Sequence, residues 1–543
     1  MKKIALLLVG LLCASGLVWA DVYQTQRQEW LKKAEAATPQ LHETIIRPVS
    51  LVKSVADPNA YQDWRMENIP GLDAFYKTPL KRGDSYILDF GKHITGYYTF
   101  TLSTLERAQD APVRIKFTFA EMPVELNTPF DPYPGGLGRA WLQDEIITLP
   151  YIDKPVTIER RLACRYVKIE VLGDSPGFQF AMSDTYFTAL SSAPEVQIEL
   201  AETTPAIIRD INRVSIETLR ECMQTVYEDG PKRDQRLWIG DLYLESIANA
   251  QSFKQFDLTK RCLYLLAALA AEDGQLHANV FEKPTPHPQY GTICQDYSLL
   301  YNVALLEYLK STGDKETALD LWPVVMNQIK LAADYIDETH LYNPQKKTPL
   351  WLFFDWCAGL NTYAPMQGLF VFALNKSYEL AQLLGKEDEA KEWPALAKQI
   401  KKAARKQLYD QKKGYFVSGP DKQVSYMSQI WMILGGVISP AEGQKALKQV
   451  MAMPDAVYPG TPYAYHYLVE AMIQCGMKAE AHQLLIDYWG GMVKKGADTF
   501  WEAYDPKDDF LSPYNFAPIN SYCHAWSCTP IYFIQRYPEI FQK

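Results

Sequence analysis

Carboxylates and aromatic rings are concentrated in two short segments of the chain. In the first, DGPKRDQRLWIGD (229–241), three carboxylates share thirteen residues with a tryptophan, a proline and several basic side chains. The second, DTFWEAYDP (498–506), places Glu502 directly after a tryptophan. Two carboxyl groups can cleave a glycosidic bond when one protonates the leaving oxygen and the other activates water or attacks the sugar. Aromatic rings would stack on the sugar, so the two segments indicate carbohydrate-cleaving chemistry.

Each of these side chains also has an ordinary structural role open to it. Asp229 and Asp241 could cap helices, and Glu502 could be a solvated loop charge. Arg233 and Asp234 could form a structural ion pair, while the nearby tryptophans could belong to the core. Because the same unusual mixture of residue types occurs in two separate segments, we favour the functional interpretation for the set.

Further polar and aromatic residues occur where every second predicted helix begins. Tyr297 and Tyr463 open two of these helices, Asp355 and Trp356 precede another, and His524 opens the last. In a ring of helical hairpins, alternate helices run in the same direction, so their first residues gather at one end of the ring. The sequence therefore predicts that these residues and the two carboxylate segments line a single pocket.

The elements that must position this pocket change type along the chain. Between residues 48 and 190 the pattern alternates with period two, as in VRIKFTF (113–119) and CRYVKIEV (164–171), with proline and glycine at intervals typical of strand ends. This pattern predicts an antiparallel β-sandwich. After residue 202 the pattern changes to amphipathic helices, about twelve of them, separated by breakers such as Gly313 and Gly385.

Twelve consecutive helices favour six hairpins closed into an (α/α)6 barrel. The competing architecture is an open helical solenoid, but the chain shows no repeat of fixed period. We therefore expect a multidomain β + α protein. Residues 21–195 would form an N-terminal antiparallel β-sandwich with a short leading helix, and residues 196–543 an (α/α)6-barrel catalytic domain.

The first twenty residues have the pattern of a cleaved signal peptide. Two lysines precede an apolar run that ends in Val18-Trp19-Ala20, a small-x-small cleavage site before Asp21. The apolar run is short for a membrane anchor, and no later segment is long and apolar enough to span a bilayer. The sequence thus predicts a periplasmic or secreted protein with no membrane anchor.

Composition and spacing argue against several other classes of function. The 55 lysines and arginines stand against 64 acidic residues, a net charge of −9 that disfavours a nucleic-acid partner. The eight histidines show no H-x-x-x-H or H-E-x-x-H spacing, and no C-x-x-C pair occurs among the cysteines. We therefore expect no metal site and no cofactor. The carboxylate and aromatic segments described above predict a carbohydrate as the partner. The oligomeric state cannot be inferred from the sequence.

At these residues the chain resembles the α-L-rhamnosidases of glycoside hydrolase family 78. The family signature reads roughly Asp-Cys-Pro-x-Arg-Asp/Glu-x-x-x-Trp-x-Gly-Asp, and here it stands as DGPKRDQRLWIGD. The segment TFWE (499–502) is similar to the family's Thr-x-Trp-Glu motif, and SYCH (521–524) to its downstream Asn-His. Two strand motifs, ILDFGKHITGYYTF (87–100) and CRYVKIEV (164–171), extend the resemblance over nearly all of the chain after the signal peptide.

This resemblance implies an inverting exo-glycosidase that removes terminal α-L-rhamnosyl residues from polysaccharides or glycosides. It implies that Asp234 is the general acid and Glu502 the general base. The remaining residues that the resemblance assigns to the pocket would bind the sugar: Asp229, Arg233, Trp238, Asp241, Asp355, Trp356 and His524.

Two departures from the family pattern leave alternatives open. Gly230 stands where the family usually has cysteine, and Gln235 stands where many members have a glutamate acid. Since glutamine cannot donate a catalytic proton, the chain could instead be an inactive carbohydrate-binding protein on the same barrel. A third possibility is an α-glycosidase for a different terminal sugar.

Overall fold

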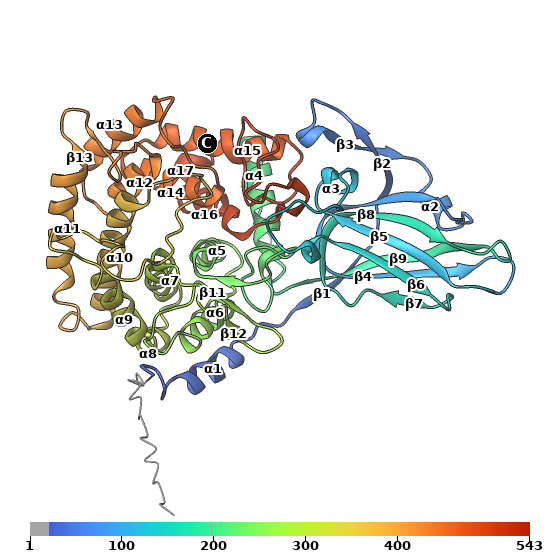
Figure 1. Cartoon of the computed structure of the whole chain (residues 1–543), viewed down its shortest axis with the longest axis horizontal. Coiled ribbons are helices and arrows are strands. Elements are labelled where there is room, and N and C mark those ends of the chain that lie inside the picture. The colour runs from blue at the N-terminus through green and yellow to red at the C-terminus, as the bar shows by residue number, and fades with distance from the viewer. Residues whose placement is uncertain (1–20, 197) are drawn as a thin grey trace, which may run out of the picture.

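The computed structural model describes residues 21–196 and 198–543 and shows a β-sandwich beside a ring of helices (Figure 1). This arrangement confirms the predicted fold class, an antiparallel β-domain followed by a helical barrel. The predicted signal peptide, residues 1–20, lies outside the described residues. Within the described part of the chain, no helix combines the length and the apolar character needed to cross a bilayer.

The sandwich contains nine strands among the described residues, all paired antiparallel. They are β1 (His42–Ile46), β2 (Ser50–Ala56), β3 (Trp64–Ile69), β4 (Ser85–Thr104), β5 (Val113–Ala120), β6 (Asp144–Leu149), β7 (Pro155–Thr157), β8 (Leu162–Gly173) and β9 (Phe180–Ser191). Alternate residues of β5, including Val113, Ile115 and Phe117, are completely buried, as the period-two pattern predicts.

The long strand β4 belongs to both layers of the sandwich. Its first half pairs with β2 and β8, and its second half with β9 and β7. The register shifts between Asp89 and Ile94, where the strand passes from one layer to the other. The rings of Phe100 on β4 and Phe117 on β5 lie 4.6 Å apart although β8 separates these strands in the sheet. The two layers therefore face each other across an aromatic core.

Twelve helices in the described part of the chain form the barrel. They are α4 (Ala206–Cys222), α5 (Ile239–Gln251), α6 (Phe256–Ala268), α7 (Gln295–Thr312), α9 (Trp322–Ala333), α10 (Tyr363–Leu384), α11 (Trp393–Leu408), α12 (Tyr426–Leu434), α13 (Pro440–Met451), α14 (Pro462–Gln474), α15 (Lys478–Lys494) and α16 (Pro530–Arg536). The helix ends follow sequence signals. Ser425 and Thr461 cap α12 and α14, and left-handed glycines 313 and 385 end α7 and α10.

The helices alternate between an inner and an outer ring. The inner helices α5, α7, α10, α12 and α14 contact one another in sequence order, and α16 packs against α5 to close the ring. Helices such as α7 are buried on nearly every face because outer helices cover them. The N-termini of the inner helices thus collect at one end of the barrel, as the hairpin arrangement predicts.

The leading helix α1 (Arg27–Ala36) belongs to the barrel by its contacts and not to the sandwich, with which the sequence analysis grouped it. It packs along α6 (Figure 1). The Arg27 guanidinium donates hydrogen bonds to the carbonyls of Ala268, Ala270 and Ala271, just beyond the last turn of α6. Carbonyl groups at the C-terminal end of a helix have no hydrogen-bond partner within that helix. The Arg27 guanidinium of α1 provides the donors for them, and its positive charge is favourable at this end of the helix dipole.

The last barrel helix begins later than the pattern predicts. The sequence pattern predicts that His524 opens this helix, but α16 begins at Pro530, which occupies the first turn. The intervening residues form an irregular segment with one short turn, η4 (Ala525–Ser527). His524 therefore precedes this turn and does not open the helix. This irregular segment places His524 and Trp526, two residues apart, at the same end of the barrel.

A buried cluster of charges joins the sandwich to the first carboxylate segment. Lys232 is completely buried, and its ammonium lies 2.8 Å from Glu121 and 3.1 Å from Glu125, both at the end of β5 and the start of the short helix α3 (Pro123–Asn127). Glu121 also accepts a hydrogen bond from the backbone N–H of Tyr522. One glutamate of the sandwich thus contacts two barrel segments that flank the pocket.

Candidate active site

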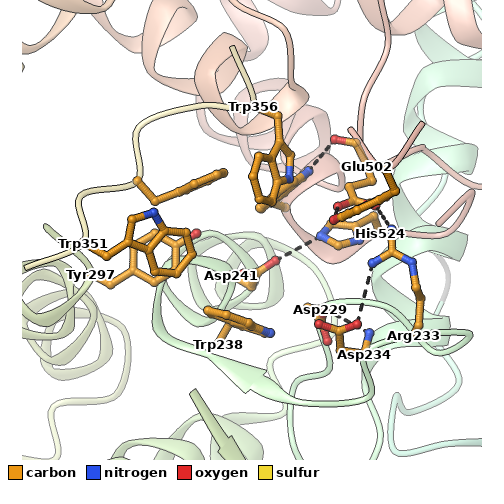
Figure 2. A pocket seen from close by; sticks show the side chains of 13 residues that line it. Asp229, Arg233, Asp234, Trp238, Asp241, Tyr297, Trp351, Trp356, Glu502 and His524 are labelled. Carbon is orange, nitrogen blue, oxygen red and sulfur yellow. Dashed lines mark hydrogen bonds and ion pairs between the residues drawn. The ribbon is translucent and has the colours of Figure 1, made fainter. Parts of the chain in front are cut away.

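One pocket opens at the N-terminal end of the inner helices and encloses about 370 Å³ of space, including its mouth (Figure 2). Polar groups and aromatic rings both line it: Asp229, Arg233, Asp234, Trp238, Asp241, Tyr297, Trp351, Phe353, Trp356, Glu502, Tyr514, His524 and Trp526. In Figure 2 Trp351 and Tyr297 lie on one side, while Glu502, His524 and Arg233 lie on the other. The pocket is therefore suited to a ligand with both apolar faces and hydroxyl groups.

The segment 229–241 folds as a tight loop that leads into α5. The carboxylate of Asp229 accepts hydrogen bonds from the backbone N–H groups of Asp234 and Arg236, both at 3.1 Å. The chain then enters β10 (Leu237–Trp238), which pairs with β11 (Asn279–Phe281), before α5 begins. Asp229 thus holds the loop around itself, and Asp241 occupies the first turn of α5 with its side chain facing the pocket.

Arg233 connects the two predicted catalytic carboxylates. Its guanidinium is buried, donates a hydrogen bond to Glu502 and lies 3.7 Å from the carboxylate of Asp234. Its Nε also donates to the Ile519 carbonyl at 2.6 Å, and the Tyr514 ring packs 4.3 Å from the guanidinium. Because Arg233 makes its closer contact with Glu502, Asp234 remains turned toward the pocket without a tight ion pair.

Glu502 has the environment of a carboxylate that stays ionised. It is 2% exposed and accepts hydrogen bonds from Arg233 and from the Tyr514 hydroxyl. Burial raises the pKa of Glu502, but the charges of Arg233 and His524 and these hydrogen bonds outweigh burial and hold it below its ordinary value. Glu502 can therefore accept a proton from water.

Asp229 has the opposite environment. Burial, followed by the negative charge of Asp234, raises the pKa of Asp229 to about 8. Its N–H donors and the charge of His524 oppose the shift without cancelling it. Asp229 therefore retains a proton near neutral pH directly beside Asp234, and a carboxyl group that keeps its proton is what general acid catalysis requires.

Asp241 and His524 face each other across the base of the pocket. Their Oδ1 and Nε2 atoms are 3.5 Å apart, and both side chains are buried. Burial lowers the pKa of His524, but Asp241 and Glu502 more than offset this effect and raise it above its ordinary value. Apart from this contact, Asp241 Oδ1 and both ring nitrogens of His524 have no hydrogen-bond partner among the described residues.

Aromatic rings form the remaining walls. Trp238 meets Trp351 edge-to-face with centroids 6.1 Å apart, and Phe353 stacks on Trp526 at 5.7 Å. Trp351 and Trp356 are 40% and 37% exposed, so they stand at the mouth of the pocket. Exposed tryptophans at a polar pocket provide flat apolar surfaces for a sugar ring.

Every predicted site residue except Asp355 lines the pocket. The Asp355 carboxylate turns away and accepts hydrogen bonds from the backbone N–H of Gly460 at 2.7 Å and from the Thr461 hydroxyl at 2.6 Å. The structure thus places Asp355 behind the pocket, where it connects the loop before α10 to the start of α14 and keeps Trp356 at the mouth. The sugar-binding and catalytic roles of the other residues remain predictions.

Some residues that line the pocket were not predicted from the sequence, and others were expected only as sequence neighbours of predicted site residues. Tyr297 opens one of the predicted helices, and Trp351 and Phe353 lie close in sequence to the predicted Asp355 and Trp356, whereas Trp526 and Tyr514 were not singled out. Tyr514 lies in a loop without periodic pattern and is brought to Glu502 by the sandwich, where the Gly136 N–H donates to its carbonyl at 3.0 Å. Nothing in the local sequence signals this contact, because its partner is several hundred residues away in the chain.

The two departures from the family signature have local structural explanations. A Cβ at Gly230 would lie 2.4 Å from the Arg233 carbonyl and 2.7 Å from the Ser521 hydroxyl, so only glycine fits this turn. Gln235 turns back into its own loop, where its amide donates to the Pro231 carbonyl at 2.8 Å. Gln235 does not line the pocket, and Asp234 is the residue of this pair that does.

Comparisons with known proteins agree with this geometry. The model of the glycosyl hydrolase family 78 alpha-rhamnosidase N-terminal domain matches residues 48–189, and that of the bacterial alpha-L-rhamnosidase 6 hairpin glycosidase domain matches residues 197–537. A rhamnosidase from Klebsiella oxytoca, solved with rhamnose bound, is 38% identical; the match covers 94% of this chain and 99% of that chain with a TM-score of 0.91. No curated protein matches the chain.

Two larger rhamnosidases share the fold at lower identity. The family 78 rhamnosidase of Bacillus sp. GL1 is 21% identical with a TM-score of 0.71 over 87% of this chain, which spans 49% of that structure. The α-L-rhamnosidase of Streptomyces avermitilis, complexed with L-rhamnose, is 16% identical with a TM-score of 0.64. That match covers 92% of this chain and 44% of the Streptomyces avermitilis chain. The two family models together match most of the chain, and the Klebsiella oxytoca rhamnosidase is similar over nearly the whole length of both chains. The chain is therefore a glycoside hydrolase that belongs to the α-L-rhamnosidases of family 78.

Proposed function

We propose that this hydrolase is an inverting exo-glycosidase that releases terminal α-L-rhamnosyl residues from polysaccharides or glycosides, in the periplasm or outside the cell. The observation that carries the proposal is the arrangement of Asp234, Arg233 and Glu502 in one aromatic pocket. The rhamnose bound to the 38% identical Klebsiella oxytoca enzyme supports the choice of sugar.

In this proposal Glu502 removes a proton from water as the water attacks the anomeric carbon. Its lowered pKa keeps it ionised, and Arg233 and Tyr514 fix the direction of its oxygens. An inverting reaction needs space for water between the two carboxyl groups, which are typically about 6.5–9.5 Å apart. The guanidinium of Arg233 contacts both carboxylates and holds them apart, which supports this geometry.

Asp234 donates the proton to the departing oxygen. Its side chain faces the pocket, and Asp229 lies directly beneath it, bonded to its backbone N–H. With a pKa of about 8, Asp229 holds a proton next to Asp234 at neutral pH. We infer that this proton is available to Asp234 in the reaction cycle. The guanidinium groups of Arg233 and Arg236 lie 3.7 and 3.5 Å from the Asp234 carboxyl group.

The depth and shape of the pocket support action on a chain end. Asp241, His524 and the Trp238–Tyr297 pair close its base and one side, and Trp351 and Trp356 flank the mouth. A pocket closed at its base admits one terminal sugar and leaves the rest of the substrate outside. Trp351 and Trp356 would then contact the part of the substrate that leaves.

The experiment that tests the proposal uses a panel of 4-nitrophenyl glycosides that differ only in the sugar. We expect nitrophenol release from the α-L-rhamnoside at a rate well above that from the other α-glycosides, and proton NMR of early product should show the β-anomer of rhamnose. Preferential hydrolysis of another glycoside would assign a different sugar. Sugar binding without any turnover would favour the binding-protein alternative, and early α-anomer would contradict inversion.

The proposed location requires removal of residues 1–20. Expression of the full chain in a bacterial host should yield a mature protein whose N-terminal sequence begins at Asp21 and which fractionates with the periplasm or medium. A mature protein that retains Met1, or that fractionates with the cytoplasm, would contradict the predicted location without affecting the catalytic proposal.

A further inference from the structure

A second cavity lies at the opposite end of the barrel from the active site. All six inner helices contribute residues to it, and the space within it that a water-sized group can occupy is about 380 Å³, compared with about 60 Å³ in the active-site pocket. This is within the range of about 300–1,000 Å³ typical of small-molecule sites. Its lining residues differ completely from those of the active-site pocket.

Two side chains on α14 present unpartnered polar atoms to this cavity. His466 is 1% exposed and Tyr467 is 2% exposed, and neither the two ring nitrogens of His466 nor the Tyr467 hydroxyl has a hydrogen-bond partner among the residues that the structure describes. Buried polar groups are nearly always hydrogen-bonded because an unpartnered group loses its interaction with water. Both residues line the cavity, so an occupant of the cavity can supply the missing partners.

The charges around the cavity leave little net field within it. Near the rim, Lys310 pairs with Glu379 and lies 3.4 Å from Glu307. Deeper in the cavity, Glu470 of α14 and Arg536 of α16 have opposite charges. Three acidic and three basic side chains line the cavity in all, which favours neither a strongly anionic nor a strongly cationic ligand.

The imidazole of His466 is held in its neutral form. Burial lowers the pKa of His466 to about 3, so near neutral pH its ring has one N–H donor and one nitrogen acceptor. Burial raises the pKa of the Glu470 carboxyl group above its ordinary value, while the hydrogen bond from Tyr532 and the charge of Arg536 oppose the shift. Donors and acceptors of this kind match hydroxyl groups, which also do both.

Aromatic rings supply flat walls between these polar groups. Tyr243, Phe372 and Tyr532 line the cavity, and the Arg536 guanidinium lies 5.5 Å from the centre of the Tyr532 ring. Such rings stack against the apolar C–H faces of a pyranose, while neutral polar groups bind its hydroxyls. From the buried unpartnered atoms, the balanced charge and the aromatic walls, we propose that this cavity binds an uncharged carbohydrate of monosaccharide size.

The two sites are separated by a single aromatic layer. Tyr463 packs 5.5 Å from Trp526 of the active-site pocket and 5.1 Å from Tyr467 of the second cavity. The cavity is thus a distinct site behind the active site, and its occupancy can be measured separately from turnover.

The test uses methyl NMR of protein labelled at isoleucine and leucine methyl groups. Ile247 and Leu434 line the second cavity, whereas no isoleucine or leucine lines the active-site pocket. Free L-rhamnose, D-glucose, D-mannose and D-galactose are titrated separately, with D-glucuronate and inorganic phosphate as charged comparators. We expect saturable shifts of the Ile247 and Leu434 methyl resonances with at least one neutral sugar and none with the charged comparators.

Variants then assign the shifts to the cavity. Glu470→Gln and His466→Phe should each weaken the binding seen at Ile247 and Leu434 by roughly tenfold, the effect of losing one or two hydrogen bonds. Asp241→Asn in the active site should leave it unchanged, and so should the control Glu480→Gln on the surface of α15. Glu470→Gln keeps the size of the side chain, so it remains informative if His466→Phe does not fold.

Three results would overturn the proposal: no shift with any neutral sugar, tighter binding of a charged comparator, or shifts that persist in folded Glu470→Gln and His466→Phe. Because glycoside hydrolysis is measured on the same samples, failure of this site is distinguishable from failure of the proposed catalytic function. A protein that hydrolyses glycosides but shows no such shifts would refute only the second site.

Discussion

Glu502 differs from Asp229 in the same pocket because the partners of Glu502 favour its charged form. Arg233 and Tyr514 both donate to it in a buried setting, whereas Asp229 meets a neighbouring carboxylate. Two carboxyl groups of the same chemistry are thus driven toward opposite protonation states by their surroundings, which is the requirement for paired acid and base catalysis.

Replacing Glu502 tests the assignment of the base. Glu502→Gln keeps the size of the side chain but cannot accept the proton, so kcat should fall by about 10²–10⁴-fold. The change is measured on a natural rhamnoside. Asp508→Asn, in the exposed loop that follows, should retain near-normal kcat as a matched control. Near-normal turnover by folded Glu502→Gln would remove Glu502 from the mechanism.

The acid is tested by varying the leaving group. Asp234→Asn should slow substrates with poor leaving groups far more than 4-nitrophenyl glycosides, because a good leaving group needs little protonation. The measurement is the ratio of kcat/KM for the two substrate types in the variant and in the unchanged protein. An equal loss on both types would show that Asp234 binds sugar and does not donate the proton.

The pH dependence of kcat follows from the same groups. The raised pKa of Asp229, about 8, predicts that activity falls above this pH as Asp229 loses its proton. On the acidic side, activity should persist below the ordinary range of a glutamate because the lowered pKa of Glu502 delays its protonation. In Asp229→Asn the alkaline limb should move, since the amide that replaces the carboxyl group cannot titrate. An unchanged limb would assign it to another group.

At the scale of elements, the loop 229–241 is anchored from outside the barrel. Lys232 enters the sandwich, where Glu121 and Glu125 at the end of β5 surround its ammonium. The next residue, Arg233, contacts Glu502. The sandwich thus sets the position of the loop that carries the catalytic groups, and its glutamates act as positioning residues.

Removing this anchor should destabilise the protein strongly. Lys232→Met leaves two buried carboxylates without their cation, and breaking such a pair typically costs about 3–5 kcal/mol in the free energy of unfolding. Lys260→Met is the matched control, because its partner Asp314 and its own side chain are partly exposed and such pairs contribute about 0–1 kcal/mol. Denaturant unfolding measures both. Similar losses for the two variants would show that the buried cluster has no special role.

At the scale of the whole molecule, the sandwich and the barrel share buried contacts. Tyr61 of the sandwich stacks on Trp501 of the barrel at 4.3 Å, and Tyr522 donates its hydroxyl hydrogen bond to Gln62 at 3.1 Å. The site is completed by the sandwich loop that contacts Tyr514. Neither part is therefore independent of the other.

We expect the two domains to unfold together. Calorimetry should show one cooperative transition, because separation of the domains exposes the Lys232 cluster and the Tyr61–Trp501 stack. Tyr61→Ala should uncouple the domains and broaden or split this transition, whereas Tyr151→Ala, an exposed tyrosine of the sandwich, should not. Two well-separated transitions in the unchanged protein would contradict this coupling.

The sequence by itself determined the fold class and most of the pocket. The period of the apolar residues distinguishes strands from helices, because each element buries one face and the period follows from its local geometry. The short spacing of Asp229, Asp234 and Asp241 brings their side chains to the start of one helix, α5. The long-range pairings were decided only in the tertiary structure. The Asp355 contact with Thr461, the support of Tyr514 by the sandwich and the attachment of α1 to the barrel each join residues whose proximity no local pattern encodes. Local patterns report which face of an element is buried, but the partner that covers this face depends on how the whole chain packs.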